Sequence, residues 1–188
     1  MARYRVGLQT RARILQATRE LLGEVGLENV TLKDITERAG VGAGSFYNLF
    51  DAKEQAVVEV LREAIVAVDP DPSGEGDETI DDLIDAFVQF MTGPSRSLAR
   101  IHLQLAGTAL TDDRIAPFLA RSHRRRVERF AAAVGRSAPT MGKTEAQAHA
   151  EVLLGALIGL AMRWMLDESF DFRGHVARLP RTPVGVTA

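Results

Sequence analysis

The sequence contains no cysteine among its 188 residues. This absence excludes disulfides, thiolate zinc sites and cysteine nucleophiles, and it fits a reducing cytoplasm. The chain also lacks an apolar run of the roughly 18 residues that a membrane span requires, because its longest candidate, residues 152–162, stops at Arg163. Its first residues are polar and basic, without the apolar core of a signal peptide. We therefore expect a cytoplasmic protein with no membrane partner.

Charged side chains are unevenly distributed, although the formal net charge is only −2. Residues 1–50 carry seven basic and five acidic side chains, residues 51–92 carry two and twelve, and residues 93–188 carry fourteen and eight. Because nucleic-acid phosphates repel an acidic segment, we expect any contact with nucleic acid to come from the first fifty residues.

Apolar residues recur at the three- and four-residue spacing of helices along nearly the whole chain, and no stretch shows sustained strand alternation. The pattern predicts an all-α protein of about nine helices. The first helix should begin with Thr10 as its cap and end at Gly23 to Gly26, the second should follow a Thr31 cap, and the fourth should begin at Asp51. Later helices are expected at 80–92, 95–110, 113–134, 144–168 and 171–179, after a loop at 69–79.

The third helical segment, VGAGSFYNLF at residues 41–50, is a weak helix former, because Gly42 and Gly44 each cost about 1 kcal/mol relative to alanine. A helical wheel places Phe46 and Phe50 on one side and Gly44 on the other. Burial of each ring supplies roughly 1.5 to 3 kcal/mol and offsets the glycines. The opposite face is small and polar and carries no Arg or Lys, which suits the second helix of a helix-turn-helix in the major groove.

The stretch TLKDITERAGVGAGSFYNLFDAKEQ, residues 31–55, resembles the DNA-binding core of the tetracycline-repressor (TetR) family. The shared features are a Thr-led helix, an Ala-Gly-Val turn, the sequence Gly-Ser-Phe-Tyr and a following Phe and Lys-Glu pair. The resemblance covers about residues 10–56, and the rest of the chain agrees in being helical and of suitable length. Two positions depart from the family: Gly42 replaces a common Ser, and Leu49 replaces a common aromatic residue or His and is expected to pack.

The resemblance implies a helix-turn-helix DNA-binding domain at residues 1–67, with the motif at about 31–50, and a C-terminal ligand-binding and dimerisation domain at 68–188. Carried over position by position, it assigns phosphate contacts to Thr31, Tyr47 and Lys53, base-edge contacts to Ser45 and Asn48, and close approach to Gly44. Since the third helix has no basic residue, we expect further phosphate contacts from Lys33, Arg3 and Arg5. The two arginines could also form a minor-groove arm, and a solvated N-terminus is the alternative for them.

The apolar helix expected at 144–168 is favoured as the dimer interface, and the core helix of a monomer is the alternative. The interface residues would be Val152, Gly155, Gly159 and Met162. The resemblance also implies an effector cavity lined by Phe87, Phe90, Met91, Ile101, His102, Leu105, Phe118, Arg121 and Trp164, although a filled core is the alternative for each of them. Such a cavity favours a small lipophilic molecule. The arginine cluster at 121–129 is either a solvated face or a phosphate site that would favour an acyl-CoA.

These features predict a TetR-family transcriptional regulator, a repressor that binds a palindromic operator in double-stranded DNA as a homodimer and is released by its effector. A ligand-independent DNA-binding protein is the alternative. A small all-α enzyme is a less favoured alternative, because the sequence contains no nucleophile elbow, phosphate loop, zinc signature or cofactor fingerprint. We expect no cofactor, and no metal, since the four histidines lack ligand spacing.

Overall fold

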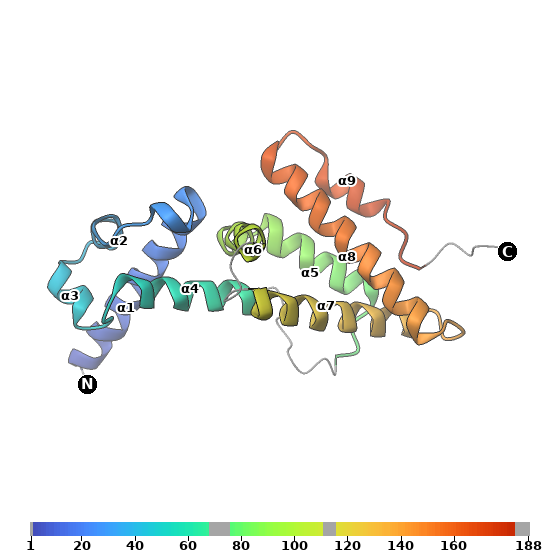
Figure 1. The fold of residues 1–188 in the computed structure, drawn as a ribbon, viewed down its shortest axis with the longest axis horizontal. Coiled ribbons are helices and arrows are strands. Elements are labelled where there is room, and N and C mark those ends of the chain that lie inside the picture. Colours follow the sequence, from blue (N-terminus) through green and yellow to red (C-terminus); the bar gives the residue numbers. More distant parts are fainter. Residues whose placement is uncertain (1, 68–75, 111–115, 183–188) are drawn as a thin grey trace. The chain divides into compact units, whose positions relative to one another are not determined.

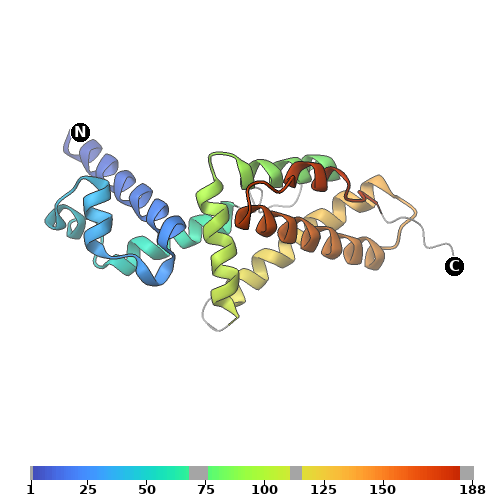
Figure 2. The same ribbon diagram turned by 90° about the horizontal axis from the view of Figure 1, so that it is seen from above.

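A computed structural model describes residues 2–67, 76–110 and 116–182. Within these ranges the chain forms nine α-helices, one short 3-10 turn and no strand (Figure 1), which confirms the all-α prediction. The helices belong to two compact units, Met1–Ala67 with Ser97–Gly107, and Val68–Arg96 with Thr108–Ala188. Figure 2 shows the helices of each unit from a second direction.

The first unit is built around α1 (Ala2–Val25), which packs against both α2 (Leu32–Ala39) and α4 (Lys53–Ala67). The buried face of α1 is the one that the apolar spacing predicts, with Ile14 and Leu22 at most 1% exposed. Between α1 and α2 lies the 3-10 turn η1 (Leu27–Asn29), and Gly26 just before it has a positive φ of 77°. A left-handed backbone at this position favours glycine.

The predicted start of α1 is wrong. The helix begins at Ala2 rather than after Thr10, so Arg3 and Arg5 are helical and do not form an extended arm. The Thr10 hydroxyl donates a hydrogen bond to the Val6 carbonyl at 2.9 Å and does not cap the helix. Threonine can also make this bond one turn back inside a helix, and the sequence pattern does not distinguish the two uses.

The fourth helix also starts later than predicted, at Lys53 instead of Asp51. The Asp51 backbone N–H donates to the Gln55 side-chain oxygen at 2.8 Å, so a glutamine at the first turn satisfies this amide. On this helix Val57 and Val60 are buried, whereas Val58 is 43% exposed.

Helix α6 (Arg96–Ala109) lies in the second half of the sequence, yet Ser97–Gly107 belong to the first unit. A Cβ atom added to Gly23 of α1 would meet the Ser97 Cβ at 3.7 Å. The Arg100 guanidinium also donates to the Gly23 carbonyl at 3.4 Å. Helices α1 and α6 thus pack against each other at Gly23, where an added Cβ atom would make an ordinary van der Waals contact with Ser97.

The second unit contains α5 (Ile80–Thr92), α7 (Ala116–Ser137), α8 (Lys143–Leu166) and α9 (Phe172–Ala177). The boundaries of α5 match the prediction. Its start is a capping box in which Thr79 and Asp82 bond reciprocally, and the hydrogen bonds from Thr79 hold the pKa of the Asp82 carboxyl below its ordinary value. The loop predicted at 69–79 and the start of the helix predicted at 113 lie partly outside the described residues. Helices α7 and α8 form a tightly packed hairpin (Figure 1).

Candidate nucleic-acid interface

Helix α2 is capped at both ends, and the turn to α3 (Ala43–Tyr47) follows its C-terminal cap. Thr31 caps α2 as predicted, and its hydroxyl accepts a hydrogen bond from the Asp34 backbone N–H at 3.2 Å. The same hydroxyl donates to the Asp34 carboxylate. Gly40 ends α2 in the left-handed conformation with φ 62°, and its N–H donates to the Glu37 carbonyl at 3.2 Å. Glycine at this position therefore sets the direction of the chain into α3.

We predict that Thr31→Ala lowers the free energy of unfolding by about 1 kcal/mol, because it removes the side-chain cap of α2. For a chain of this size the melting temperature should fall by about 2 to 4 °C. Thermal denaturation followed by circular dichroism measures the change, and Thr31→Ser, which keeps the hydroxyl, is the matched control. Equal melting temperatures for the alanine and serine variants would show that the cap is not formed in solution.

Two phenylalanines on its buried face anchor the short helix α3. Phe46 is fully buried and Phe50 is 2% exposed, and their ring centroids lie 5.3 Å apart. The Tyr47 ring contacts Phe46 edge-on, with centroids 5.7 Å apart and an interplanar angle of 86°. Leu49 is half-buried, as the sequence predicts for a packing residue. Burial of these rings thus stabilises a helix that its glycines destabilise.

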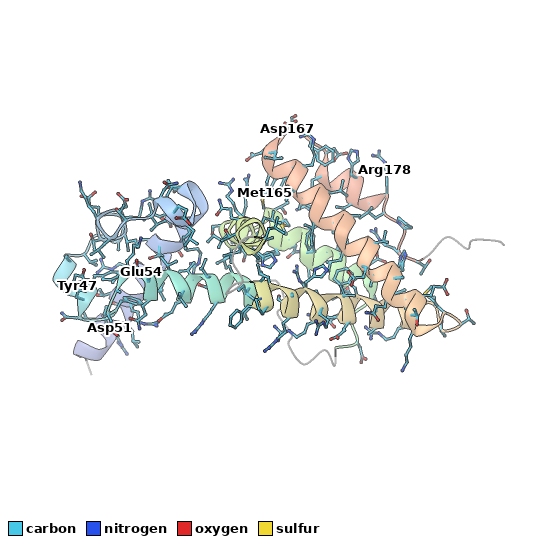
Figure 3. All side chains as sticks on the ribbon, in the orientation of Figure 1. Tyr47, Asp51, Glu54, Met165, Asp167 and Arg178 are labelled. Carbon is cyan, nitrogen blue, oxygen red and sulfur yellow. The ribbon has the colours of Figure 1, made fainter. Side chains whose placement is uncertain are left out.

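The opposite face of α3 is exposed and small. Gly44, Ser45 and Asn48 are exposed, and Tyr47 (Figure 3) is 56% exposed. A Cβ atom added to Gly42 or Gly44 would meet nothing within 4 Å, and neither glycine has a positive φ. The packing of the described chain therefore does not require glycine at either position, whereas close approach of another molecule to the backbone would.

The three polar side chains of this face make no hydrogen bond to the described part of the chain. Ser45, Tyr47 and Asn48 thus keep their donors and acceptors available to a bound molecule. Asn48 ends α3 in a right-handed helical conformation, and its backbone N–H bonds to the Gly44 carbonyl at 3.1 Å. The backbone of Asn48 is therefore fixed, while its side-chain amide faces solvent.

Basic residues near α3 differ in how they are held. The Lys33 side chain is 80% exposed and lies 3.8 Å from the Glu37 carboxylate. The Lys53 ammonium donates to the Val30 carbonyl at 2.8 Å, and the Lys53 side chain is only 30% exposed. Sequence reasoning missed this bond, which makes Lys53 a structural tie between the α4 start and the segment before α2. Arg5 is exposed on α1, and the side chain of Arg3 lies outside the described set.

Sequence reasoning also missed Arg11. Its guanidinium lies 5.4 Å from the centroid of the Phe50 ring and pairs with the Glu59 carboxylate on α4. The Arg11 side chain is 42% exposed. This contact ties α1 and α4 to the anchor of α3, and only the tertiary structure brings these residues together.

A second exposed surface runs along α8, and we call it the α8 face. Val152 is 71% exposed, Met162 is 47% exposed, and the intervening Gly155 and Gly159 are also exposed. Leu166, which the sequence analysis did not include, extends this face and is 79% exposed. A Cβ atom at either glycine would meet nothing within 4 Å. Burial within one chain thus accounts for only part of the apolar character of α8.

Helix α8 is also long and apolar enough to cross a membrane when only length and composition are considered. Within the described chain, however, Leu153, Leu154, Leu157 and Ala161 are buried, and α7 packs along α8. A core helix of a water-soluble protein has the same composition.

The residues predicted to line an effector cavity fall into two groups. Met91, Ile101, His102 and Leu105 are buried, but Ile101, His102 and Leu105 belong to the first unit and Met91 to the second. Phe87, Phe90 and Trp164 are half-buried. Phe118 is 63% exposed and Arg121 is exposed, so the placement of these two inside the protein is wrong. Both lie on the outer face of α7, which the apolar spacing did not identify.

The arginine cluster of α7 does not form one solvated face. Arg126 is 6% exposed, and Arg129 pairs with Glu78. His123, for which the sequence shows no carboxylate partner, lies 3.2 Å from the Glu151 carboxylate on α8. The described residues contain no group of His, Cys, Asp or Glu that could hold a metal ion.

An open groove of about 720 Å³ lies on the first unit, between α1, α2 and α4. Its rim carries paired charges, because Arg19 binds Glu63 and Arg38 binds Glu24 at 2.9 Å and Glu20 at 3.4 Å. The hydrogen bond from Arg38 lowers the pKa of Glu24. None of the predicted effector residues lines this groove.

Comparisons with known proteins agree with this geometry. The chain is 42% identical over 52 residues to the HTH-type transcriptional repressor KstR2 of Rhodococcus jostii (strain RHA1), a match that spans 28% of this chain and 26% of that protein. A transcriptional regulator of Aquifex aeolicus VF5 superposes with a TM-score of 0.65 at 21% identity, covering 90% of this chain and 94% of that one. A regulator of Saccharomonospora viridis, solved in complex with choline, gives a TM-score of 0.70 at 19% identity over 89% of this chain and 93% of that one.

The two structural matches show that the described fold is shared over nearly the whole chain, and the KstR2 match spans only about a quarter of that relative's length. The segment that carries α2, α3 and their turn falls inside residues 14–60, which match the family described as "Bacterial regulatory proteins, tetR family". Residues 14–60 of the chain therefore match the tetR family of bacterial regulatory proteins, and the described fold is the one that these solved regulators share.

Proposed function

We propose that this protein is a transcriptional repressor that binds a palindromic operator as a homodimer in the cytoplasm and leaves it when a small lipophilic effector binds. The observation that carries the proposal is the exposed face of α3, which is small, polar and free of hydrogen bonds to the described chain. Two buried phenylalanines hold this face in place. Such a helix can enter the major groove without a steric barrier from its own side chains.

The contacts to DNA divide into two kinds. Lys33, Tyr47 and the N-terminal arginines Arg3 and Arg5 would bind phosphates and position the protein, while Ser45 and Asn48 would meet base edges. Thr31 and Lys53 already bond within the chain, so each would contact phosphate while keeping a structural bond. Gly44 would allow the backbone to come close to the duplex.

The α8 face supplies the proposed dimer contact. Its glycines would let two helices approach closely, and Val152, Met162 and Leu166 would lose their exposure to water. A two-fold dimer then presents two α3 helices to two half-sites, with centres about 34 to 36 Å apart or somewhat more. The need for a palindromic operator follows from this symmetry.

The effector proposal rests on the apolar residues that the sequence assigns to the cavity and on the fold, which the choline-bound regulator of Saccharomonospora viridis shares. For release, the effector must bind the DNA-incompetent state more tightly, because equal affinity for both states shifts neither. Arg121 is exposed, so an acyl-CoA would have to bring its phosphates to the protein surface. The alternative is a DNA-binding protein without a ligand.

We predict that a lipophilic compound both raises the melting temperature and releases the protein from its operator. A panel of acyl-CoAs, free fatty acids and neutral sterols should be titrated against the complex, with fluorescence anisotropy of labelled DNA as the readout. An acyl-CoA effector should lose potency in Arg121→Ala, whereas a neutral one should not. If a compound stabilises the protein without releasing it from DNA, the protein binds a ligand but the ligand does not switch DNA binding. If no compound in the panel causes either response, the ligand-free alternative is favoured.

The DNA-binding proposal is tested by selecting bound duplexes from a random pool and footprinting the best of them. We expect symmetric protection of two half-sites and an affinity that falls steeply with salt, since phosphate contacts dominate the binding. Protection of a single asymmetric site would contradict the dimeric arrangement.

A further inference from the structure

We infer that α3 reads A·T base pairs, so that the positions of each half-site contacted by this helix are adenine or thymine. The inference rests on the proposed function and concerns the chemistry of the DNA that the same face selects. It follows from which hydrogen-bonding groups α3 exposes and which it lacks.

Helix α3 lacks charged side chains. Residues 41–50 contain no Arg, Lys, Asp or Glu. In the major groove guanine offers two acceptors, O6 and N7, which Arg or Lys usually reads, and cytosine offers an N4 donor that a carboxylate reads. The exposed face of α3 therefore lacks the side chains that recognise a G·C pair most strongly.

Asn48 can supply the contact to adenine. Its side-chain amide carries one acceptor and two donors, which match the N6 donor and the N7 acceptor of adenine. The amide is exposed and makes no hydrogen bond to the described chain, while the backbone of this residue is fixed by bonds to Gly44 and Phe46. A fixed backbone and an unused amide are what a bidentate contact to adenine requires.

Thymine carries a C5 methyl group, which makes apolar contacts in the same groove. Ala43 presents an exposed methyl group at the start of α3, next to the bare backbone of Gly44. The Tyr47 ring, set edge-on by Phe46, adds an apolar surface that is 56% exposed. Ser45 can bond to either kind of pair and adds no preference.

The basic residues closest to α3 in sequence are Arg38, Lys53 and Lys33, and all three lie outside it. Arg38 pairs with Glu24 and Glu20, and Lys53 is held by the Val30 carbonyl. Lys33 is exposed and lies 3.8 Å from the Glu37 carboxylate, so it is the one of the three with the freedom to reach a guanine. The test must therefore separate reading by Asn48 from reading by Lys33.

The experiment measures the affinity of the full chain for duplexes derived from the selected operator, with each of the four bases placed in turn at every half-site position. We expect the most discriminating positions to be A·T pairs, with a loss of about 5- to 150-fold on change to G·C. Asn48→Ala should remove the preference at one position. The near-isosteric Asn48→Asp, which cannot donate, should move the preference there from adenine towards cytosine. Lys33→Ala should weaken all duplexes about equally.

Melting temperatures within about 1 °C of the unsubstituted protein would show that the Asn48 variants fold. A required G·C pair at the most discriminating position, unchanged in Asn48→Asp, would overturn the inference and leave the proposed regulator intact. A protein that binds all duplexes equally would overturn both the inference and the proposed function.

Discussion

Replacing Gly159 by leucine is expected to yield a folded monomer that no longer binds its operator. Gly159 lies in the middle of the α8 face, it is exposed, and a Cβ atom there would meet nothing within 4 Å of the described chain. Leucine therefore fits the single chain and favours the helix by about 1 kcal/mol relative to glycine. In the proposed dimer, however, the same side chain stands where a second helix must approach.

The expected loss of operator affinity is at least about 100-fold, because a monomer keeps only one half-site and the weak non-specific binding that phosphates provide. Sedimentation velocity measures the association state, and anisotropy measures the affinity for the selected duplex. Gly107→Leu is the matched control, since Gly107 is also helical and exposed with nothing within 4 Å of its Cβ position. If both Gly155→Leu and Gly159→Leu sediment as intact dimers, the interface lies elsewhere.

Gly44→Ala is expected to stabilise the protein and weaken its binding to DNA at the same time. Gly44 is helical and exposed, its φ is not positive, and nothing lies within 4 Å of its Cβ position. Alanine should raise the free energy of unfolding by roughly 0.5 to 1 kcal/mol. If the α3 backbone approaches the duplex closely, the added methyl group should lower the affinity by about tenfold, or roughly 1.4 kcal/mol.

The opposite signs of the two effects make this variant informative. A substitution that merely damages the fold lowers both stability and affinity, whereas this one should separate them. Gly107→Ala offers the same gain in helix propensity away from α3 and should leave the affinity unchanged. An unchanged affinity in Gly44→Ala would mean that α3 does not bring its backbone close to DNA.

Local signals in the sequence predicted several elements of the fold correctly. The helix predicted at 80–92 matches α5 at both ends. Thr31 caps α2 as predicted, and Gly40 ends α2 in the left-handed conformation. At the two ends of α2 a side chain or the left-handed backbone acts on its own helix, so that a few neighbouring residues contain the information.

The sequence failed where the partner of a residue is distant in the chain. Lys53 bonds to the Val30 carbonyl 23 residues away, and Arg11 pairs with Glu59 48 residues away. Phe118 was expected to line the effector cavity that the resemblance implies, but it is 63% exposed on α7. The same limitation applies to α6, whose Arg100 donates to the Gly23 carbonyl of α1, 77 residues away.

The candidate DNA site was predictable to a similar extent. The identity of its exposed residues follows from the helical phase that Phe46 and Phe50 impose on α3. The structural use of Lys53 does not, because its ammonium could equally serve a phosphate in an isolated motif. The unused hydrogen-bonding capacity of Asn48 is evident only after the tertiary contacts of α3 are known.

The measurement that tests the central claim most directly is sedimentation of the protein mixed with a labelled palindromic duplex taken from the selection, beside a scrambled duplex of equal length and composition. We predict a complex of two chains, or a multiple of two, on the palindrome, and no stable complex on the scrambled duplex at physiological salt. Replacement of Ser45, Tyr47 and Asn48 by alanine together should abolish the specific complex without unfolding the protein. Equal binding of the two duplexes, or a specific complex that survives the triple replacement, would contradict the account.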